Sequence, residues 1–293
     1  MTQITLNKLV IIGVGLIGGS FALALRKAGV VKHVAGVGRS RENMQHALEH
    51  GVIDEVAENM ASALNDADCV LLAMPVGQTE AIMTQIAPHL QAGAIITDTG
   101  STKQDVVTAA RNHLGNNLKN FVPGHPIAGA EHSGVLAAQS DLYTGKHVIL
   151  TPLEETHIDA VKKITALWQA CDAKVSQMQV AEHDEILAAT SHLPHVLAFA
   201  LMNHLHRSTD NPKNLLRFAG SGFRDFTRIA SSSPEMWRDI CLANREALLK
   251  QIAAYQDELN ALHVILKNGD GEALEKLFSQ ARRMREDWLK NMG

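Results

Sequence analysis

Short apolar segments alternate with helical patterns over the first half of the chain. Six apolar runs are candidate strands: residues 9–12, 33–37, 68–74, 93–97, 120–122 and 147–150. The stretches between them, such as residues 18–28 and 78–89, repeat their apolar positions at helical spacing. Strands that are apolar along their whole length are buried on both faces. The pattern therefore predicts a parallel sheet with helices on both sides.

The pattern changes near residue 178, where the strand-like runs cease. Helices are expected over residues 181–205, 234–243 and 272–289. Before the last of these, one long helix carries a single apolar stripe, with spacings of four and three residues in turn: Leu248, Ile252, Tyr255, Leu259, Leu262 and Leu266. The sequence predicts an α/β domain over residues 1–178 and an all-α domain over residues 179–293. The stripe packs either inside the helical domain or against a second subunit.

Composition and charge narrow the class of protein. The 293 residues have a net charge of −4, which gives no reason to expect nucleic acid or a membrane surface as a partner. Cys69, Cys171 and Cys241 form no CxxC pair, so neither disulfides nor a structural metal is expected. The chain opens without a signal-peptide pattern, and no apolar run reaches the ~20 residues of a membrane span. A cytoplasmic location is expected.

The first candidate strand runs into a glycine-rich turn that opens a helix. The segment reads Gly13-Val-Gly15-Leu16-Ile17-Gly18. In such a turn the first glycine permits the bend, the second lets a pyrophosphate approach the backbone, and the third lets the helix pack closely on the strand. The N–H groups at the helix N-terminus favour an anion. This context predicts a dinucleotide site in a Rossmann-like domain.

The residues after the second candidate strand bear on the choice of dinucleotide. NAD enzymes usually place an acidic residue there, which binds the ribose hydroxyls. Here the segment reads Gly38-Arg39-Ser40-Arg41. An arginine can pair with a 2′-phosphate through two parallel hydrogen bonds. We therefore expect NADP, with NAD possible, unless both arginines are solvated surface residues.

Two loops are expected at the carboxyl edge of the sheet, where the reactive end of a dinucleotide lies. One contains Ser101 and Lys103, and the other contains His125 between Gly124 and Pro126. A histidine is a plausible general base because its pKa lies near neutrality. Ser101 is expected to orient it.

Further polar residues interrupt the predicted helices of the second domain. His192 and His195 are three residues apart and share one face of a helix. Without a third ligand type nearby they predict a polar substrate wall rather than a metal site. Arg224 and Arg228 would also share a side and could bind a carboxylate, or could form a structural ion pair with Asp225.

Taken together, the motifs are similar to those of one family. The chain resembles the prephenate/arogenate dehydrogenases of tyrosine biosynthesis over nearly its full length. The matching segments are Gly13-x-Gly15-x-x-Gly18-Gly-Ser, Gly100-Ser101-x-Lys103, Gly124-His125-Pro126-Ile-Ala-Gly, Ser191-His192-Leu-Pro-His195 and Gly222-Phe-Arg224-Asp225-x-x-Arg228-Ile-Ala.

The resemblance implies oxidative decarboxylation of a cyclohexadienol, arogenate or prephenate, with hydride transfer to a nicotinamide. Arogenate is favoured here, because in such families NADP and a compact chain often go with it. The family's helical domain forms a homodimer, which favours packing of the apolar stripe Leu248–Leu266 against a second subunit. By resemblance, His125 and Ser101 are catalytic, and five residues meet the substrate: His192, His195, Arg228, Asp225 and Glu131. Since the chain ends at Gly293, right after its predicted helices, we expect no regulatory ACT domain and little or no feedback inhibition through one.

Two alternatives remain at this point. One is another NADP-dependent dehydrogenase of the same plan, such as a β-hydroxyacid dehydrogenase or an imine reductase. Those enzymes usually depend on a lysine in the helical domain, whereas this chain has the two histidines there. The other is a protein that senses NADP without turnover. The combination of His125, Ser101 and Arg228 speaks against it.

Overall fold

The computed structural model describes residues 5–130, 132–208 and 215–290. The chain divides into two compact units, Met1–Arg245 and Glu246–Gly293. Each unit is described by itself. The division predicted between residues 178 and 179 stays a prediction.

A six-stranded parallel sheet forms the centre of the first unit, with strand order β3-β2-β1-β4-β5-β6. The order reverses between β1 and β4, and in such sheets the crevice at the carboxyl ends of these strands is the binding site. The strands are β1 (Leu6–Ile12), β2 (Val31–Val37), β3 (Glu55–Val56), β4 (Cys69–Leu72), β5 (Ile95–Asp98) and β6 (Phe121–Val122). The predicted fold class is confirmed.

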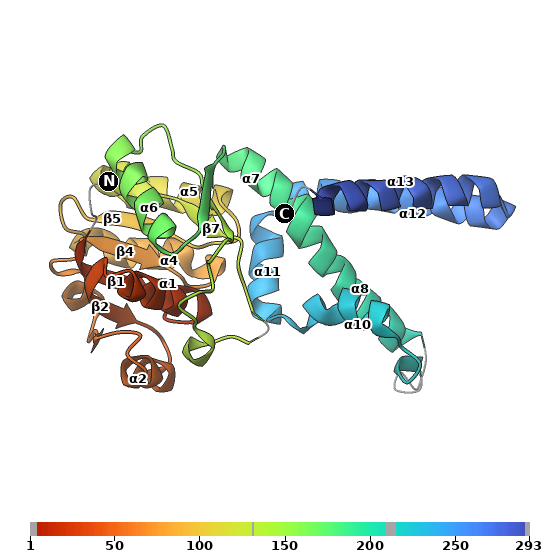
Figure 1. Ribbon diagram of the computed structural model, residues 1–293. Coiled ribbons are helices and arrows are strands. Elements are labelled where there is room, and N and C mark those ends of the chain that lie inside the picture. The colour runs from red at the N-terminus through yellow and green to blue at the C-terminus, as the bar shows by residue number, and fades with distance from the viewer. Residues whose placement is uncertain (1–4, 131, 209–214, 291–293) are drawn as a thin grey trace. The chain divides into compact units, whose positions relative to one another are not determined.

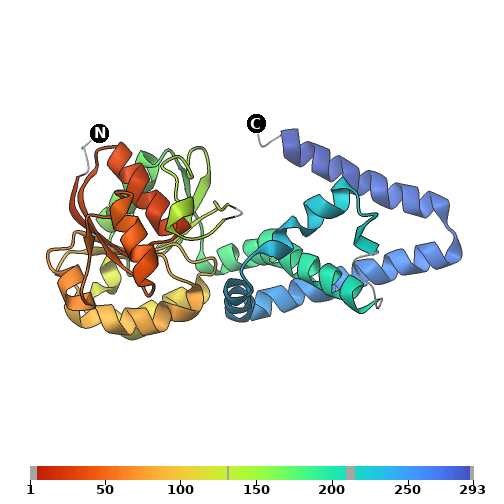
Figure 2. The same cartoon turned by 90° about the horizontal axis from the view of Figure 1, so that it is seen from below.

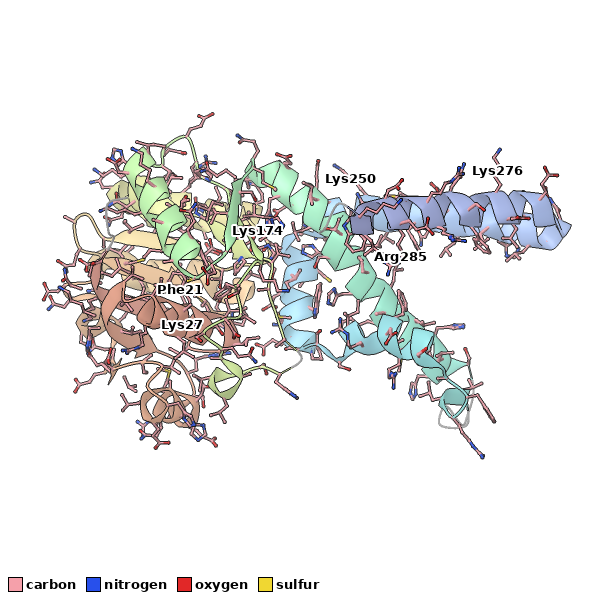
Figure 3. All side chains as sticks on the ribbon, in the orientation of Figure 1. Phe21, Lys27, Lys174, Lys250, Lys276 and Arg285 are labelled. Carbon is pink, nitrogen blue, oxygen red and sulfur yellow. The ribbon has the colours of Figure 1, made fainter. Side chains whose placement is uncertain are left out.

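Helices cover both faces of this sheet, as Figures 1 and 2 show. On one face lie α1 (Leu16–Lys27), α2 (Arg41–Glu49) and α6 (Ile158–Ala170). Phe21 of α1, labelled in Figure 3, packs against Trp168 of α6 with ring centroids 4.5 Å apart. The other face is covered by α3 (Met60–Leu64), α4 (Thr79–Ile86) and α5 (Gln104–His113). Because each strand is buried from both sides, its residues are apolar without alternation.

A second, three-stranded sheet follows the first in the chain. Its strands are β7 (Gly124–Pro126), β8 (His147–Leu150) and β9 (Lys174–Gln177). β7 pairs with β8 antiparallel, and β8 pairs with β9 parallel. The prediction that residues 124–129 form a loop is wrong for residues 124–126, because their backbone pairs with β8. The sequence also missed β9, which is mostly exposed and reads Lys-Val-Ser-Gln.

One long helix connects this region to the helical part of the first unit. It consists of α7 (Val180–Leu187), the π-helical turn η5 (Ala188–His192) and α8 (Leu193–Arg207). Over its 28 residues, it is long and apolar enough to cross a membrane by length and composition, contrary to the sequence expectation. Its buried His183, Asp184 and His192 form hydrogen bonds to other parts of the first unit.

Shorter helices complete the first unit. α10 (Ser221–Thr227) and the 3₁₀ turn η6 (Arg228–Ser231) both contact α8. They are followed by α11 (Pro234–Ala243), which begins and ends as predicted. The remaining 3₁₀ turns are η1 (Val76–Gln78), η2 (Ala87–His89), η3 (Gly115–Asn120) and η4 (Val135–Ala137).

The second unit is a helical hairpin. α12 (Arg245–Asn268) and α13 (Gly271–Lys290) are joined at Gly269, whose φ of 66° favours glycine. Figure 3 labels Lys276 and Arg285 on α13, and the Arg285 guanidinium lies 5.9 Å from the Trp288 ring centroid. Much of the hairpin's apolar surface is exposed, with nine large side chains between 38% and 79% accessible: Leu249, Tyr255, Leu259, Val264, Leu266, Phe278, Met284, Trp288 and Leu289.

Candidate active site

The glycine turn between β1 and α1 has the geometry that a dinucleotide requires. Gly13 has a φ of 99°, and a Cβ there would lie 2.6 Å from the backbone of Ala73. A Cβ on Gly18 would lie 2.5 Å from the carbonyl oxygen of Gly13, so glycine is needed for the helix to pack here. A Cβ on Gly15 would meet nothing within 4 Å. The turn therefore leaves the backbone open at the N-terminus of α1, whose first residues are Leu16 and Ile17, as the approach of a pyrophosphate requires.

The segment after β2 combines structural residues with exposed cations. A Cβ on Gly38 would lie 2.5 Å from Met44 Sδ, so this position needs glycine. Ser40 caps α2, because its Oγ accepts a hydrogen bond of 3.2 Å from the Asn43 N–H. Arg39 and Arg41 are exposed on either side of Ser40. Arg39 and Arg41 are therefore the residues of this segment whose side chains can bind a phosphate.

A buried ion pair organises the carboxyl edge of the sheet. Asp98, the last residue of β5, accepts a hydrogen bond from the ammonium group of Lys103, whose side chain is fully buried. The Asp98 carboxylate also accepts hydrogen bonds from the N–H groups of Gly100 at 2.7 Å and of Gly124 at 3.0 Å. One carboxylate thus fixes the loop after β5 to the start of β7.

His125 is held in the middle of β7, where it is only 8% exposed. Its Nδ1 lies 2.9 Å from Nε2 of His183 on α7. Burial lowers the pKa of His125 well below its usual value, and the nearby His183, Lys103 and His192 lower it further. The neutral form of the imidazole is therefore favoured at physiological pH.

Sequence reasoning missed His183 and its neighbour Asp184. The Nδ1 of His183 lies 2.7 Å from Oδ1 of Asp184. The carboxylate also accepts the N–H groups of Lys103 and Gln104, both at 2.9 Å, and so caps the N-terminus of α5. Burial alone would raise the pKa of Asp184, but these hydrogen bonds outweigh it and leave the pKa lowered. In the sequence the pair stands in the polar run Glu182–Glu185, which gives no sign that two of its members are buried.

His192 lies in η5, fully buried and close to the same cluster. Asn244, at the end of α11, places its Nδ2 at 2.7 Å from the carbonyl oxygen of Asp184 and 3.2 Å from His192 Nδ1. An amide nitrogen only donates, so His192 Nδ1 is the acceptor and Nε2 carries the proton. Burial lowers the pKa of His192 to about 4. His192 is therefore neutral and can donate a hydrogen bond from Nε2.

The structure places Ser101 beside His192. Ser101 is half-buried in the loop after β5, and its backbone lies close to the His192 imidazole. Among the described residues, no hydrogen bond joins Ser101 to His125, whose Nδ1 is bound by His183 instead. The orienting role of Ser101 therefore stays a prediction.

His195 and Arg228 form a second group on the helices. The His195 ring stacks on Trp237 with centroids 3.7 Å apart, and its Nδ1 donates to the carbonyl oxygen of Ser191 at 2.8 Å. Burial lowers the pKa of His195, and the positive charge of Arg228 lowers it further. Asp225 is exposed on α10, one turn before Arg228. Glu131 lies outside the described residues.

The described side chains suit proton transfer rather than metal chemistry. Over residues 5–130, 132–208 and 215–290, no group of three or more His, Cys, Asp or Glu side chains is arranged to hold a metal ion. Instead, two uncharged imidazoles lie at this site: His125, a candidate base, and His192, whose Nε2 can donate a hydrogen bond. The open glycine turn follows β1 at the carboxyl edge of the same sheet. Such a site can remove a proton from a bound hydroxyl while a cofactor takes the electrons.

Comparisons with known proteins agree along the whole chain. A family model described as the nucleotide-binding domain of prephenate dehydrogenase matches residues 21–177, and one described as its dimerization domain matches residues 179–280. Prephenate dehydrogenase of Bacillus subtilis is 38% identical over 281 residues, which cover 96% of this chain and 76% of that protein.

Solved structures give the same result. The crystal structure of prephenate dehydrogenase from Aquifex aeolicus in complex with hydroxyphenyl propionate and NAD+ has a TM-score of 0.91 and 37% identity, over 98% of this chain and 99% of that one. The structure of Synechocystis arogenate dehydrogenase has a TM-score of 0.80 and 29% identity, over 96% of this chain and 99% of that one. This chain therefore belongs to the prephenate dehydrogenase family of nicotinamide-dependent oxidoreductases.

Proposed function

We propose that the protein oxidises and decarboxylates a cyclohexadienyl substrate, converting arogenate to tyrosine or prephenate to 4-hydroxyphenylpyruvate. The observation that carries this proposal is the position of His125 at the carboxyl edge of the sheet, where its Nδ1 lies 2.9 Å from His183 Nε2 and burial lowers its pKa. A base that is uncharged at physiological pH is what withdrawal of a hydroxyl proton needs. Relatives named for both substrates match nearly the full chain.

The residues act on the substrate in separate roles. His125 accepts the proton of the ring hydroxyl, while His192 donates a hydrogen bond from Nε2 and Arg228 binds a substrate carboxylate. We assign Ser101 a role beside the nicotinamide, and His195, Asp225 and Glu131 a role in binding the substrate. When bound, a nicotinamide supplies the acceptor for the hydride of the ring carbon. Loss of CO2 then returns the electrons of the broken C–C bond to the ring, which becomes aromatic.

Initial rates with four combinations, arogenate or prephenate with NAD or NADP, test the proposal directly. We expect turnover of a cyclohexadienyl substrate, with arogenate and NADP giving the highest kcat/KM. A site that pairs the ammonium group of arogenate would reject the keto analogue, because a buried acceptor would be left without a partner. Binding of the dinucleotide without turnover of either substrate would contradict the proposed function.

The proposed preference for NADP depends on Arg39 and Arg41. Both are exposed where NAD enzymes usually place an acidic residue. We expect Arg39→Asp to shift the ratio of kcat/KM for NADP over NAD toward NAD by roughly 10-fold or more, the value of one strong charged hydrogen bond. Steady-state kinetics with each cofactor measures this ratio. The matched control is Lys32→Asp, which removes an exposed cation earlier on β2 and should leave the ratio unchanged. A ratio that stays constant in Arg39→Asp would show that this arginine does not bind the 2′-phosphate.

The proposed role of Arg228 predicts a defect in substrate binding. We expect Arg228→Ala to raise KM for the cyclohexadienyl substrate by about 10- to 100-fold, since a hydrogen bond to a charged group contributes ~1.5–3 kcal/mol. The change in kcat should be smaller. Arg238→Ala, at an exposed arginine on α11 that pairs with Asp239, serves as the control. An unchanged KM in Arg228→Ala would leave this arginine with a structural role alone.

The exposed apolar surface of α12 and α13 supports a homodimer. Exposed apolar patches of this kind mark interaction surfaces, and the family model over residues 179–280 is described as a dimerization domain. We propose that the stripe from Leu248 to Leu266 is a seam between two copies of residues 179–293, the helical domain, and that residues 1–178 are the dinucleotide-binding domain. Leu248 itself is only 4% exposed, so the seam consists of the stripe's exposed members, Tyr255, Leu259 and Leu266. The mass in solution by light scattering tests the dimer. A cytoplasmic location fits a small-molecule biosynthetic reaction of this kind.

A further inference from the structure

Three buried groups form a continuous chain of hydrogen bonds that ends at His125. Asp184 and His183 lie next to each other on α7, which Figure 1 places beside β7. The carboxylate is 2.7 Å from Nδ1 of His183, and Nε2 of His183 is 2.9 Å from Nδ1 of His125. None of the three side chains is more than 8% exposed. Water is therefore excluded from these two contacts, and the proton positions are set by the groups themselves.

The chemistry of the donors and acceptors fixes where the protons lie. The Asp184 carboxylate only accepts, so the proton in its contact with His183 is on Nδ1 of His183. A neutral His183 then has a lone pair on Nε2, and the proton in the next contact is on Nδ1 of His125. His125 is neutral, so its own Nε2 carries no proton. That nitrogen is the atom that can accept a proton from a substrate.

A second arrangement would reverse this result. If His183 carried a proton on both nitrogens, His125 would accept at Nδ1 and hold its proton on Nε2, where it could not act as a base. This arrangement puts an imidazolium on a side chain that is fully buried, and burial disfavours the charged form. The Asp184 carboxylate offsets part of that cost but is shared with the N–H groups of Lys103 and Gln104, so the first arrangement is favoured.

We propose that His183 and Asp184 are positioning residues that hold His125 in the tautomer with a free lone pair on Nε2. The inference deepens the proposed function and rests on it, because it specifies how His125 becomes a base for the ring hydroxyl. The logic is that of the aspartate in a serine protease triad, which holds a histidine in its working tautomer. Here a second imidazole stands between the carboxylate and the base.

Nitrogen NMR of the wild-type protein reads the tautomer directly. The protein is labelled with ¹⁵N-histidine, and the His125 signals are assigned as those that disappear in His125→Asn. We expect an Nδ1 shift typical of a protonated nitrogen and an Nε2 shift typical of an unprotonated one, at pH 7 without substrate. A proton on Nε2 of His125 would overturn the proposal. This measurement needs no turnover, so it stands apart from the outcome of the activity assays.

Substitutions at His183 add a kinetic test with a built-in rescue. His183→Phe removes the acceptor for the His125 Nδ1 proton, whereas His183→Gln keeps an oxygen where Nε2 was. We expect kcat to fall by about 10- to 100-fold in His183→Phe, less than removal of the base itself can cost, and the Gln variant to recover most of it. KM and the affinity for the dinucleotide should change less than about 3-fold. Equal losses in both variants, or no loss in His183→Phe, would contradict the proposal; if the Phe variant does not fold, the NMR result decides.

Discussion

Replacing His125 with Asn lowers kcat by at least ~100-fold while the affinity for the dinucleotide stays within a few-fold of the wild type, which is the result we expect for loss of a general base. Asparagine keeps a polar group of similar size in the middle of β7, but it cannot accept a proton from the substrate. The glycine turn proposed to bind the cofactor follows β1 and is not altered by the change. Steady-state kinetics and a dinucleotide titration by fluorescence measure the two quantities.

The control for this experiment is the same substitution at another histidine. His147 is exposed and begins β8, the strand that pairs with β7. His147→Asn should leave kcat within about 2-fold of the wild type, as expected for a surface position. Near-normal turnover of His125→Asn would remove His125 from the mechanism and with it the central part of the proposed function.

The second large effect concerns stability. Lys103→Met leaves the Asp98 carboxylate buried without its cation, and loss of one partner of a buried ion pair costs about 3–5 kcal/mol. The Asp98 side chain is only 3% exposed and still accepts two backbone N–H groups, so it cannot turn toward water. Methionine fills the volume of lysine, so the loss measures the charge rather than a cavity. The midpoint of urea unfolding, followed by circular dichroism, should fall accordingly.

An exposed ion pair provides the comparison. Lys162 pairs with Asp159 at 3.2 Å on α6, and both side chains are more than two-thirds exposed. Lys162→Met should change the free energy of unfolding by less than ~1 kcal/mol, because solvent screens such a pair. If Lys103→Met and Lys162→Met shifted the midpoint equally, the Lys103–Asp98 pair would contribute no more than a surface contact.

The parts of the fold that depend on local pattern could be predicted from the sequence. Leu9–Ile12, followed by Gly13, Gly15 and Gly18, specifies a buried strand, a tight turn and a closely packed helix within ten residues, and the structure has all three. The parallel sheet and the family were confirmed as well. In each case the physical requirement falls on neighbouring residues, so it leaves a pattern that can be read.

The parts of the site that depend on contacts between distant segments could not be predicted. His183 meets His125 across 58 positions, and Asp184 meets Lys103 across 81. Neither member of the His183–Asp184 pair has a distinctive spacing, because what matters is the tertiary contact. β7 was missed for the same reason: its three residues are a strand only because β8 lies beside them. Asn244 contacts His192 across 52 positions and left no signal either.

The π-helical turn η5 has a geometric consequence for the two histidines of the long helix. In a straight α-helix each residue advances by roughly 100°, so nine residues would place His183 and His192 on nearly opposite sides. A π turn contains about one residue more than an α-helical turn, so the rotation about the helix axis between His183 and His192 is about 100° smaller. The two side chains then point in directions roughly a quarter of a turn apart. Asn244 contacts both the carbonyl oxygen of Asp184 and the imidazole of His192 across this turn. The relative direction of the two imidazoles is thus a property of the helix backbone, and a substitution that straightened this wide turn would separate them without changing either histidine.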